Sequence, residues 1–431
     1  MTFDSLGLRA ELLRAVAAQG FTEPTPVQAR SIPTVLQGRD LMASARTGTG
    51  KTAAFALPML HRLSQSHRRT KAPRALVLVP TRELAAQVHE TFGDLGEHLR
   101  LRAEVVFGGV NINPQIKRIA RGVDIVVATP GRLIDLMQRE CMRLDDVDTL
   151  VLDEADRMLD MGFRPSLERI VRALPEKRQT LMFSATYSSE IEQLAKRYMH
   201  APERVETAPP NATVDAIAQE AIRVDQARKR ELLSWMIGRN DWRQVLVFTR
   251  TKHGANRLAK QLEKDGVSAA AIHGNKSQGA RTRALDGFKR GRVRALVATD
   301  IAARGLDIDQ LPHVVNFEIP EVPADYVHRI GRTGRAGREG LAVSMVAGAE
   351  IGRFEAIRKL VRDEIPTRVV EGYEPTEPLD HGAGARRGGR QVSGGGRAAG
   401  GGRAGGASGK RNGRRGRRGG AGRGRSAGAS G

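Results

Sequence analysis

Several features are scarce in this chain, and each shortage excludes a class of protein. Only one of its 431 residues is a cysteine, Cys141, which excludes an intramolecular disulfide and a multi-thiolate metal site. The ten histidines are scattered, with no pair at ligand spacing beside a carboxylate. No apolar run reaches membrane-spanning length. The N-terminal stretch carries acidic residues early and lacks the layout of a signal peptide, so we expect a cytoplasmic protein without a membrane partner.

Acidic residues are absent from the last 50 positions. Residues 382–431 hold 13 Lys or Arg, 21 glycines, no Asp or Glu and no aromatic residue, and they supply more than half of the chain's formal charge of +22. Such a segment buries too little apolar surface to fold, so we expect a disordered basic tail. Its default partner is a polyanion, above all nucleic acid. A solubilising tail without a partner is the alternative.

The rest of the chain alternates short apolar runs with helical patterns. The runs in the first half are near-continuously apolar, which is typical of strands buried on both faces: DLMASA, RALVLVP, EVVFGG, DIVVATP, TLVLDEA and QTLMFSAT. A βαβ series of this kind predicts an α/β fold with a parallel, doubly wound sheet. Proline clusters and periodicity fails around residues 202–215, after which the alternation restarts. We therefore expect domains at residues 1–206 and 216–370, a linker at 207–215, and a C-terminal linker and tail from 371 to 431.

The segment ASARTGTGKT, residues 43–52, follows the first predicted strand and opens a helix, and it resembles a P-loop. Glycines in such a loop let backbone N–H groups wrap phosphates at a helix N-terminus. Lys51 is expected to contact the β- and γ-phosphates, and the Thr52 hydroxyl to bind Mg²⁺. The generic pattern has glycine at position 45, where this chain has alanine. The remaining predicted nucleotide contacts of the loop are Thr47, Gly48, Thr49 and Gly50.

A buried strand that ends in Asp153, Glu154 and Asp156 concentrates negative charge and needs a compensating cation. A P-loop protein holds Mg²⁺ at such a strand end. Neighbouring side chains of an extended strand point to opposite sides. We therefore expect Asp153 to face the metal and Glu154 to face the water that attacks the γ-phosphate of ATP.

The sequence DEAD itself, with these motifs, resembles the DEAD-box RNA helicases over residues 3 to about 345. The segments NKSQGARTRALDGFKRG and VFGGVNINPQ are most similar to the bacterial RhlE branch. The resemblance implies two tandem RecA-like domains, ATP and Mg²⁺ as cofactors, and single-stranded RNA and short RNA duplexes as partners. It also implies that Phe3 stacks on adenine, that Gln28 bonds its edge, and that Asp156, Ser184 and Thr186 couple hydrolysis to strand separation. The implied RNA contacts are Pro80, Thr81, Arg82, Gly109, Thr129, Arg132, Arg250, Gly274, Gln278, Arg281, Thr299 and Arg304.

The segment HRIGRTGR belongs to the second predicted domain and carries a basic cluster. If it is helical, His328, Arg332 and Arg335 share one face. Arginines aimed at the γ-phosphate stabilise transition-state charge, which the resemblance implies for Arg332 and Arg335. It also implies that Asp307 contacts the nucleotide and that Arg304 helps to close the cleft. Arg46 stands where the family often has glutamine.

Three functions fit these patterns. The first is an ATP-dependent RNA helicase that separates short duplexes and remodels RNA–protein complexes, in ribosome assembly or RNA turnover. The second is a DNA translocase on the same two-domain core, against which the DEAD, PTREL and Gln28 motifs argue. The third is an RNA chaperone that acts mainly through its basic tail. The intact Lys51, Glu154, Arg332 and Arg335 argue for an active ATPase.

Overall fold

The computed structural model describes residues 1–44, 49–65, 71–185, 187–206, 217–303, 308, 311–334, 340–361 and 364–376. The predicted tail from 382 lies outside the described residues. So do several predicted site residues: Thr47, Gly48, Thr186, Arg304, Asp307 and Arg335. In the described part of the chain, no helix is long and apolar enough to cross a membrane.

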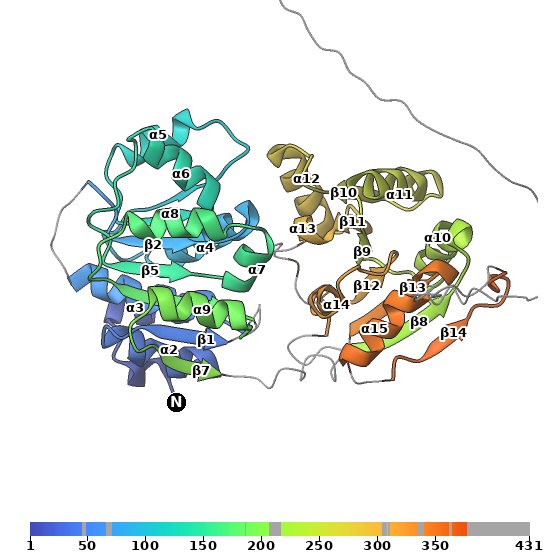
Figure 1. The fold of residues 1–431 in the computed structure, drawn as a ribbon, viewed down its shortest axis with the longest axis horizontal. Coiled ribbons are helices and arrows are strands. Elements are labelled where there is room, and N and C mark those ends of the chain that lie inside the picture. Colours follow the sequence, from blue (N-terminus) through green and yellow to red (C-terminus); the bar gives the residue numbers. More distant parts are fainter. Residues whose placement is uncertain are drawn as a thin grey trace, which may run out of the picture. The chain divides into compact units, whose positions relative to one another are not determined.

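The first domain is built on one parallel sheet (Figure 1). Its strand order is β3-β4-β2-β5-β6-β1-β7. The strands are β1 (Leu41–Ser44), β2 (Ala75–Leu78), β3 (Ala103–Val106), β4 (Ile125–Ala128), β5 (Thr149–Leu152), β6 (Gln179–Ser184) and β7 (Glu203–Glu206). The helices are η1 (Phe3–Leu6), α1 (Ala10–Ala18), α2 (Pro26–Leu36), α3 (Lys51–Gln65), α4 (Arg82–Leu95), α5 (Asn113–Ile119), α6 (Pro130–Gln138), α7 (Ala155–Asp160), α8 (Arg164–Arg172) and α9 (Ser189–Tyr198).

The second domain repeats this topology, because its order β10-β11-β9-β12-β13-β8-β14 matches the first sheet strand for strand. The strands are β8 (Ile217–Arg223), β9 (Val245–Thr249), β10 (Ala269–Ile272), β11 (Ala295–Thr299), β12 (His313–Asn316), β13 (Gly340–Val346) and β14 (Thr367–Val369). The helices are η2 (Gln226–Arg228), α10 (Lys229–Arg239), α11 (Lys252–Lys264), α12 (Gln278–Lys289), α13 (Asp300–Ala303), α14 (Pro323–Ile330), η3 (Gly348–Glu350) and α15 (Ile351–Val361). The predicted tandem of doubly wound parallel sheets is confirmed.

Each sheet is buried on both faces, as the continuous apolar runs predicted. Along β2, Leu76 and Leu78 pack into the cluster that includes α6, α8 and α9, whereas Ala75 and Val77 pack into the cluster that includes α1 to α4. This division follows from the two-residue period of a strand, which sends alternate side chains to opposite faces. In the second domain α10 and α11 cover one face, and α12 to α15 cover the other.

The sequence patterns missed three strands. Strand β7 lies within residues 202–215, where prolines cluster and no strand pattern was recognised, and it ends directly before the predicted linker at 207–215. Strands β8 and β14 also went unnoticed because they are more polar than the central strands: only three of the seven residues of β8 are buried, and β14 is exposed. β7 and β14 are edge strands, which are solvated on one side and need no continuous apolar run. Ordered packing also continues past residue 370, since Tyr373 is buried in the second domain's core.

A buried ion pair ties together four segments of the second domain. Lys229, the first residue of α10, is fully buried and donates to the carbonyls of Phe317 at 2.9 Å and Met345 at 2.7 Å. Its ammonium group also pairs with the Glu350 carboxylate. Burial lowers the pKa of Lys229, and Glu350 opposes that change. The carboxylate in turn accepts the backbone N–H groups of Ile319 and Ala347.

We expect Lys229→Ala to lower the free energy of unfolding by about 3–5 kcal/mol, because it leaves the Glu350 carboxylate buried without its cation. Urea unfolding followed by circular dichroism measures the change. The matched control is Arg230→Ala on the same helix, whose pair with Asp265 is partly exposed and should contribute at most about 1 kcal/mol. Equal losses in the two variants would contradict a special role for the buried pair.

Candidate nucleotide and RNA site

The phosphate loop joins β1 to α3, as the sequence predicted. Thr49 and Gly50 directly precede α3, and Lys51 begins the helix with only 6% of its surface exposed. Thr52, in the first turn, is half-buried. Gly50 has a φ of +85°, and a Cβ there would lie 2.3 Å from the Gln28 amide nitrogen. Glycine is therefore required at position 50 by both backbone conformation and space.

Two buried carboxylates follow β5 in the same domain. Asp153 is 2% exposed and Glu154 is 3% exposed. Burial raises the pKa of Asp153 to about 6, against the opposing attraction of the Lys51 ammonium. Burial alone would also raise the pKa of Glu154, but the charges of Arg157, Lys51 and Arg332 together hold it below its usual value. The two neighbouring acids therefore meet different electrostatic environments, a common feature of catalytic pairs.

The backbone at these acids differs from the extended strand end that the sequence suggested. Strand β5 ends at Leu152, and Glu154 adopts a left-handed conformation with a φ of +53° as the N-cap of α7. The Asp153 carboxylate accepts the Glu154 N–H at 3.0 Å. Both carboxylates thus lie in a turn and not on an extended strand, so the predicted geometry of opposite strand faces was wrong.

Asp156 connects the acidic turn to β6. Its Oδ2 accepts the backbone N–H of Ala185 at 3.0 Å, directly after the buried Ser184 at the end of β6. Asp156 and Ser184, two residues with predicted coupling roles, are therefore brought together, while Thr186 lies outside the described residues. A change at the acidic turn has a short covalent and hydrogen-bonded route to the end of β6.

The predicted adenine contacts have partners within the protein. The Gln28 amide donates to the Gly50 carbonyl at 3.1 Å and its oxygen accepts the Thr25 N–H at 2.9 Å. Gln28 thus links the start of α2 directly to the phosphate loop, a contact that the sequence patterns did not indicate. Phe3 is 4% exposed and packs in the first domain's core, so its ring offers little free surface in this conformation.

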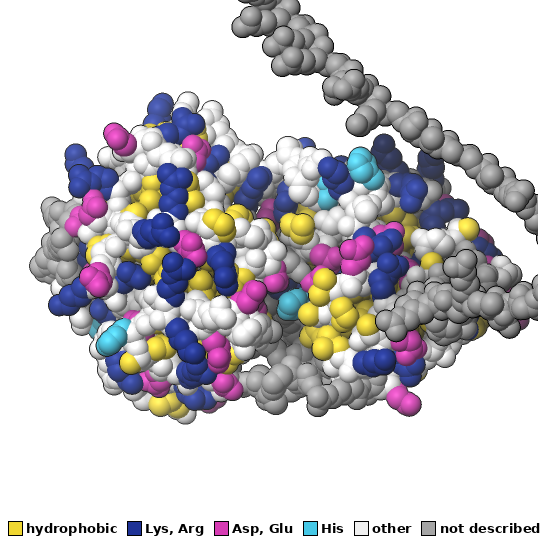
Figure 2. Space-filling view, viewed as in Figure 1, with side chains coloured by type: hydrophobic (Ala, Val, Ile, Leu, Met, Phe, Trp, Pro, Cys, Tyr) yellow, Lys and Arg dark blue, Asp and Glu magenta, His cyan; other side chains and the backbone are white. Residues whose placement is uncertain are grey.

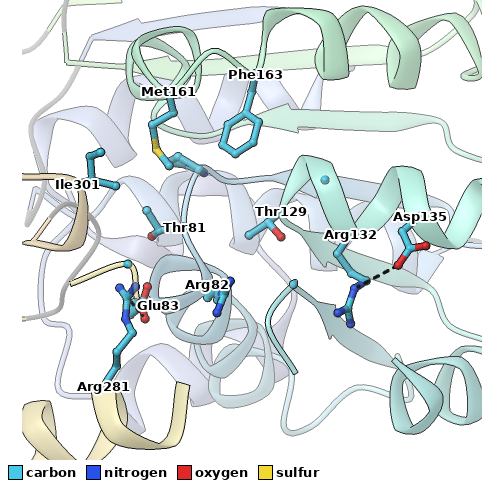
Figure 3. Close-up of a pocket in the computed structure, with 14 residues that line it drawn as sticks. Thr81, Arg82, Glu83, Thr129, Arg132, Asp135, Met161, Phe163, Arg281 and Ile301 are labelled. Carbon is cyan, nitrogen blue, oxygen red and sulfur yellow. Dashed lines mark ion pairs between the residues drawn. The ribbon is translucent and has the colours of Figure 1, made fainter. Parts of the chain in front are cut away.

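Predicted RNA contacts converge on a cavity of about 440 Å³. Figure 3 shows Arg82 and Arg132 on one side of it and the apolar Met161 and Phe163 on another. The cavity combines hydroxyls, arginines and apolar side chains, which suits a sugar–phosphate backbone. The predicted contacts that line it are Pro80, Thr81, Arg82, Thr129, Arg132, Gly274 and Arg281.

Glycine at position 109 makes room for an arginine of the cavity. Gly109 has a φ of +74°, and a Cβ there would lie 1.9 Å from Nη1 of Arg82. Arg132 donates from Nη2 to the Val110 carbonyl at 2.8 Å, which holds the same loop from its other side. The loop at residues 108–110 thus holds the guanidinium of Arg132 and leaves space for that of Arg82.

Glu83 is a further residue of this cavity that the sequence patterns did not single out. Nη2 of Arg281 lies 2.9 Å from Oε1 of Glu83, and Gln278 donates to the same oxygen at 3.0 Å. Two predicted RNA contacts of α12 therefore have a carboxylate partner. The sequence indicated a role for Glu83 only through its place after Thr81 and Arg82 in the segment PTREL.

The remaining predicted RNA contacts of the second domain lie outside this cavity's lining. Arg250 follows β9, and its Nη1 donates to Glu321 at 3.2 Å while its backbone N–H donates to Glu318. Thr299 ends β11, where it is half-buried. Both follow the carboxyl ends of their strands, the edge where open α/β sheets bind ligands.

The segment HRIGRTGR is only partly helical. α14 ends at Ile330, so Arg332 lies beyond the helix and the predicted helical face shared with His328 was wrong. Arg332 is 2% exposed, and His328 is half-buried with Nδ1 4.0 Å from Asp325. Arg329 was overlooked: it is 1% exposed, and its guanidinium pairs with Asp300 at 2.7 Å and lies over the Phe248 ring. It anchors this segment to the second domain.

Positive charge on the face of the first domain that carries α8 and α9 is interrupted by acids. Figure 2 shows dark blue Lys and Arg interspersed with magenta Asp and Glu on that face. Arg197 pairs with Glu168 at 2.8 Å, and Arg204 pairs with Glu192 at 3.2 Å. This face therefore resembles a solvated surface of mixed charge more than a nucleic-acid interface.

The residues present fit a Mg²⁺ ion that is bound together with phosphates. Asp153 is a buried carboxylate whose charge is poorly compensated, as its raised pKa shows, and Thr52 supplies a hydroxyl. No group of three or more His, Cys, Asp or Glu side chains comes together among the described residues. Mg²⁺ commonly binds one or two carboxylates plus substrate phosphates and water, which matches this sparse set.

Comparison with known proteins agrees with this geometry. Residues 25–194 match the DEAD/DEAH box helicase family, and residues 228–337 match the helicase conserved C-terminal domain. The DEAD-box ATP-dependent RNA helicase CshA of Bacillus cereus is 42% identical over 380 residues, which cover 86% of this chain and 72% of CshA. The ATP-dependent RNA helicase RhlB of Pseudomonas syringae is also 42% identical, covering 85% of this chain and 96% of RhlB.

Solved structures match both domains. The structure of S. cerevisiae Dbp5 bound to RNA and ADP BeF3 has a TM-score of 0.76 at 35% identity and covers 85% of this chain and 95% of Dbp5. The structure of Mss116p bound to single-stranded RNA and AMP-PNP has a TM-score of 0.77 at 29% identity, covering 86% and 80% of the two chains. On its motifs, its two matched domains and these relatives, the chain belongs to the DEAD/DEAH box helicase family.

Proposed function

We propose that the protein is an ATP-dependent RNA helicase that couples RNA-stimulated ATP hydrolysis to local separation of short RNA duplexes. One observation carries the proposal: the buried acids Asp153 and Glu154 lie within electrostatic reach of Lys51 at the start of the phosphate-loop helix. A cation and two acids in such different environments suit phosphoryl transfer from ATP to water. The relatives' names and the RNA and nucleotide analogues in the solved structures support the same reaction.

Each residue of the nucleotide site has a role in this proposal. Lys51 neutralises the β- and γ-phosphates, and the loop residues Thr47 to Gly50 wrap them. Thr52 and Asp153 would hold Mg²⁺, largely through water, and this ion would supply stabilisation of the charge on the phosphates. Glu154, kept ionised by its cationic neighbours, accepts a proton from the attacking water. The nucleotide is also bound by Phe3, Gln28 and Asp307. The second domain contributes further residues to ATP hydrolysis: Arg332, Arg335 and His328.

The cavity beside Arg82 and Arg132 is proposed to bind the RNA backbone. Glu83 then competes with phosphate for Arg281, because one guanidinium serves both anions. Asp156 and Ser184, with Thr186, transmit the state of the nucleotide site to the RNA site. The contact between Asp156 and the Ala185 backbone supports this route.

Finer assignments follow from the motifs. We place the protein in the RhlE branch on the segments NKSQGARTRALDGFKRG and VFGGVNINPQ, although the relatives described above are CshA and RhlB. We also propose a cytoplasmic location, with ribosomal precursors or the RNA-decay machinery as partners. An RNA chaperone that acts mainly through the tail is the second candidate, supported by the 13 basic and no acidic residues of positions 382–431.

We expect the full chain to hydrolyse ATP faster with single-stranded RNA than with single-stranded DNA, and Glu154→Gln to reduce that hydrolysis to a small residual rate. The glutamine side chain keeps the shape of the glutamate but cannot accept the proton from water. The variant should still form an ATP-dependent complex with RNA, because Lys51 and the phosphate loop remain. Phosphate release measures hydrolysis, and filter binding measures the complex.

Lys51→Ala serves as the control, since it should lose the ATP-dependent RNA complex as well as hydrolysis. Stimulation by DNA equal to that by RNA would favour the translocase. ATP hydrolysis by Glu154→Gln at the parental rate would show that Glu154 is not the base. Strand annealing without any ATPase activity would favour the chaperone.

Asp153→Asn should stabilise the nucleotide-free protein while abolishing hydrolysis. The native carboxyl keeps its proton up to about pH 6, whereas the ordinary value is 3.8, so its ionisation opposes folding as pH rises through this window. At pH 7.5 the variant should gain on the order of 1–3 kcal/mol, and the gain should be smaller at pH 5. Urea unfolding at both pH values tests this. A variant less stable than the parent at pH 7.5 would show that the charge of the Asp153 carboxylate is compensated in the folded protein.

Deletion of residues 382–431 should leave the maximal ATPase rate nearly unchanged and raise the RNA concentration needed to reach it. The tail has charge but no aromatic residue for base stacking, so its contacts should be with phosphates. If roughly six of its basic residues engage a single strand, the deletion should flatten the slope of log affinity against log salt by about 4. RNA binding and ATPase assays across a salt series measure both effects. Parallel salt slopes would show that the tail does not bind phosphates.

A further inference from the structure

Arg157 is a buried cation of the short helix α7 (Ala155–Asp160). It is only 6% exposed, and an arginine removed from water is costly unless it is paired. A residue in this position needs a compensating contact.

The compensating contact is with Glu154. A single nitrogen, Nη1 of Arg157, donates to Oε1 of Glu154 at 2.8 Å and to Oε2 at 2.7 Å. The two side chains are 7% and 4% exposed, so water screens the pair little. A donor shared between both oxygens fixes the position of the whole carboxylate. Each oxygen retains a further lone pair that can accept a hydrogen bond from water.

The backbone of Glu154 is held as well. A φ of +53° is uncommon for a residue with a side chain and is energetically unfavourable. Such a conformation persists where surrounding contacts impose it. The Asp153 carboxylate binds the Glu154 N–H, and Arg157 binds the far end of the side chain. Both the backbone and the carboxylate of Glu154 are therefore held in place, whereas a turn on the surface needs no such contacts.

We propose that Arg157 is a positioning residue for ATP hydrolysis, which holds the Glu154 carboxylate in the orientation that receives the proton of the attacking water. This inference rests on the proposed function, in which Glu154 is the general base. Arg157 acts through Glu154 and touches neither ATP nor water itself. Its effect is one of geometry, and a misplacement of about 1 Å at a reacting group can lower a rate by about 10²-fold.

Steady-state ATPase assays of Arg157→Gln at saturating RNA test the proposal. We expect kcat to fall by about 10- to 100-fold, while the KM for ATP and the half-saturating RNA concentration stay within about twofold. Arg157→Lys keeps the charge and should restore part of kcat. The matched control is Arg172→Gln on α8, whose side chain is 74% exposed and 4.0 Å from Glu168, and which should change none of these parameters.

A second comparison separates positioning from general stability. In the Glu154→Gln background, adding Arg157→Gln should not lower the residual rate further, because Arg157 acts only through Glu154. This double variant removes both charges of the pair together, so it avoids an unpaired buried carboxylate if Arg157→Gln alone fails to fold. A further drop in the residual rate, with ATP binding retained, would overturn the proposal.

The remaining outcomes are also decisive. A parental protein without RNA-stimulated ATPase activity would overturn the proposed function, and this inference with it. An active parent whose folded Arg157→Gln variant retains its kcat would overturn this inference alone. A higher RNA-independent rate in Arg157→Gln would also overturn it, because the pair would then restrain Glu154 rather than orient it.

Discussion

The rest of the nucleotide site depends on two acidic residues, Asp153 and Glu154, which follow β5 and place negative charge in the protein interior. Asp153 and Glu154 are both almost fully buried, and each has a different means of compensation. The charge of Glu154 is balanced by Arg157, with help from Lys51 and Arg332, whereas Asp153 is left with a pKa of about 6. An uncompensated carboxylate beside a phosphate loop favours a bound cation, which is the physical basis of the proposed Mg²⁺ site.

The second domain has the same topology but places a buried lysine in different surroundings. Both sheets have the same strand order, and α10 follows β8 as α3 follows β1. Each of these helices begins with a buried lysine, Lys51 in α3 and Lys229 in α10. Lys229 is satisfied by Glu350 and two backbone carbonyls, so its charge serves packing. Lys51 lies beside a loop and two acids instead, which leaves its charge to act on phosphates.

Short local contacts shape both of the proposed ligand sites. The acidic turn reaches the end of β6 through Asp156 and the Ala185 N–H, and Gln28 reaches the phosphate loop through the Gly50 carbonyl. The proposed RNA cavity is shaped by similar means, since the absence of a Cβ at Gly109 leaves space for Arg82. Backbone atoms carry these contacts, so small movements of loops change the orientation of charged side chains.

The sequence by itself determined the fold class, the central strands and the approximate place of the nucleotide site, because continuous apolar runs and glycine-rich loops are local signals. It missed β7, β8 and β14, whose polar residues suit edge or partly exposed strands, and it left open whether HRIGRTGR is helical, which the structure shows only as far as Ile330. Only the tertiary structure decided which charges meet: Glu154 with Arg157, Glu83 with Arg281, and Lys229 with Glu350. Side-chain pairing depends on burial and backbone conformation, such as the left-handed turn at Glu154, and residue spacing along the chain does not specify either.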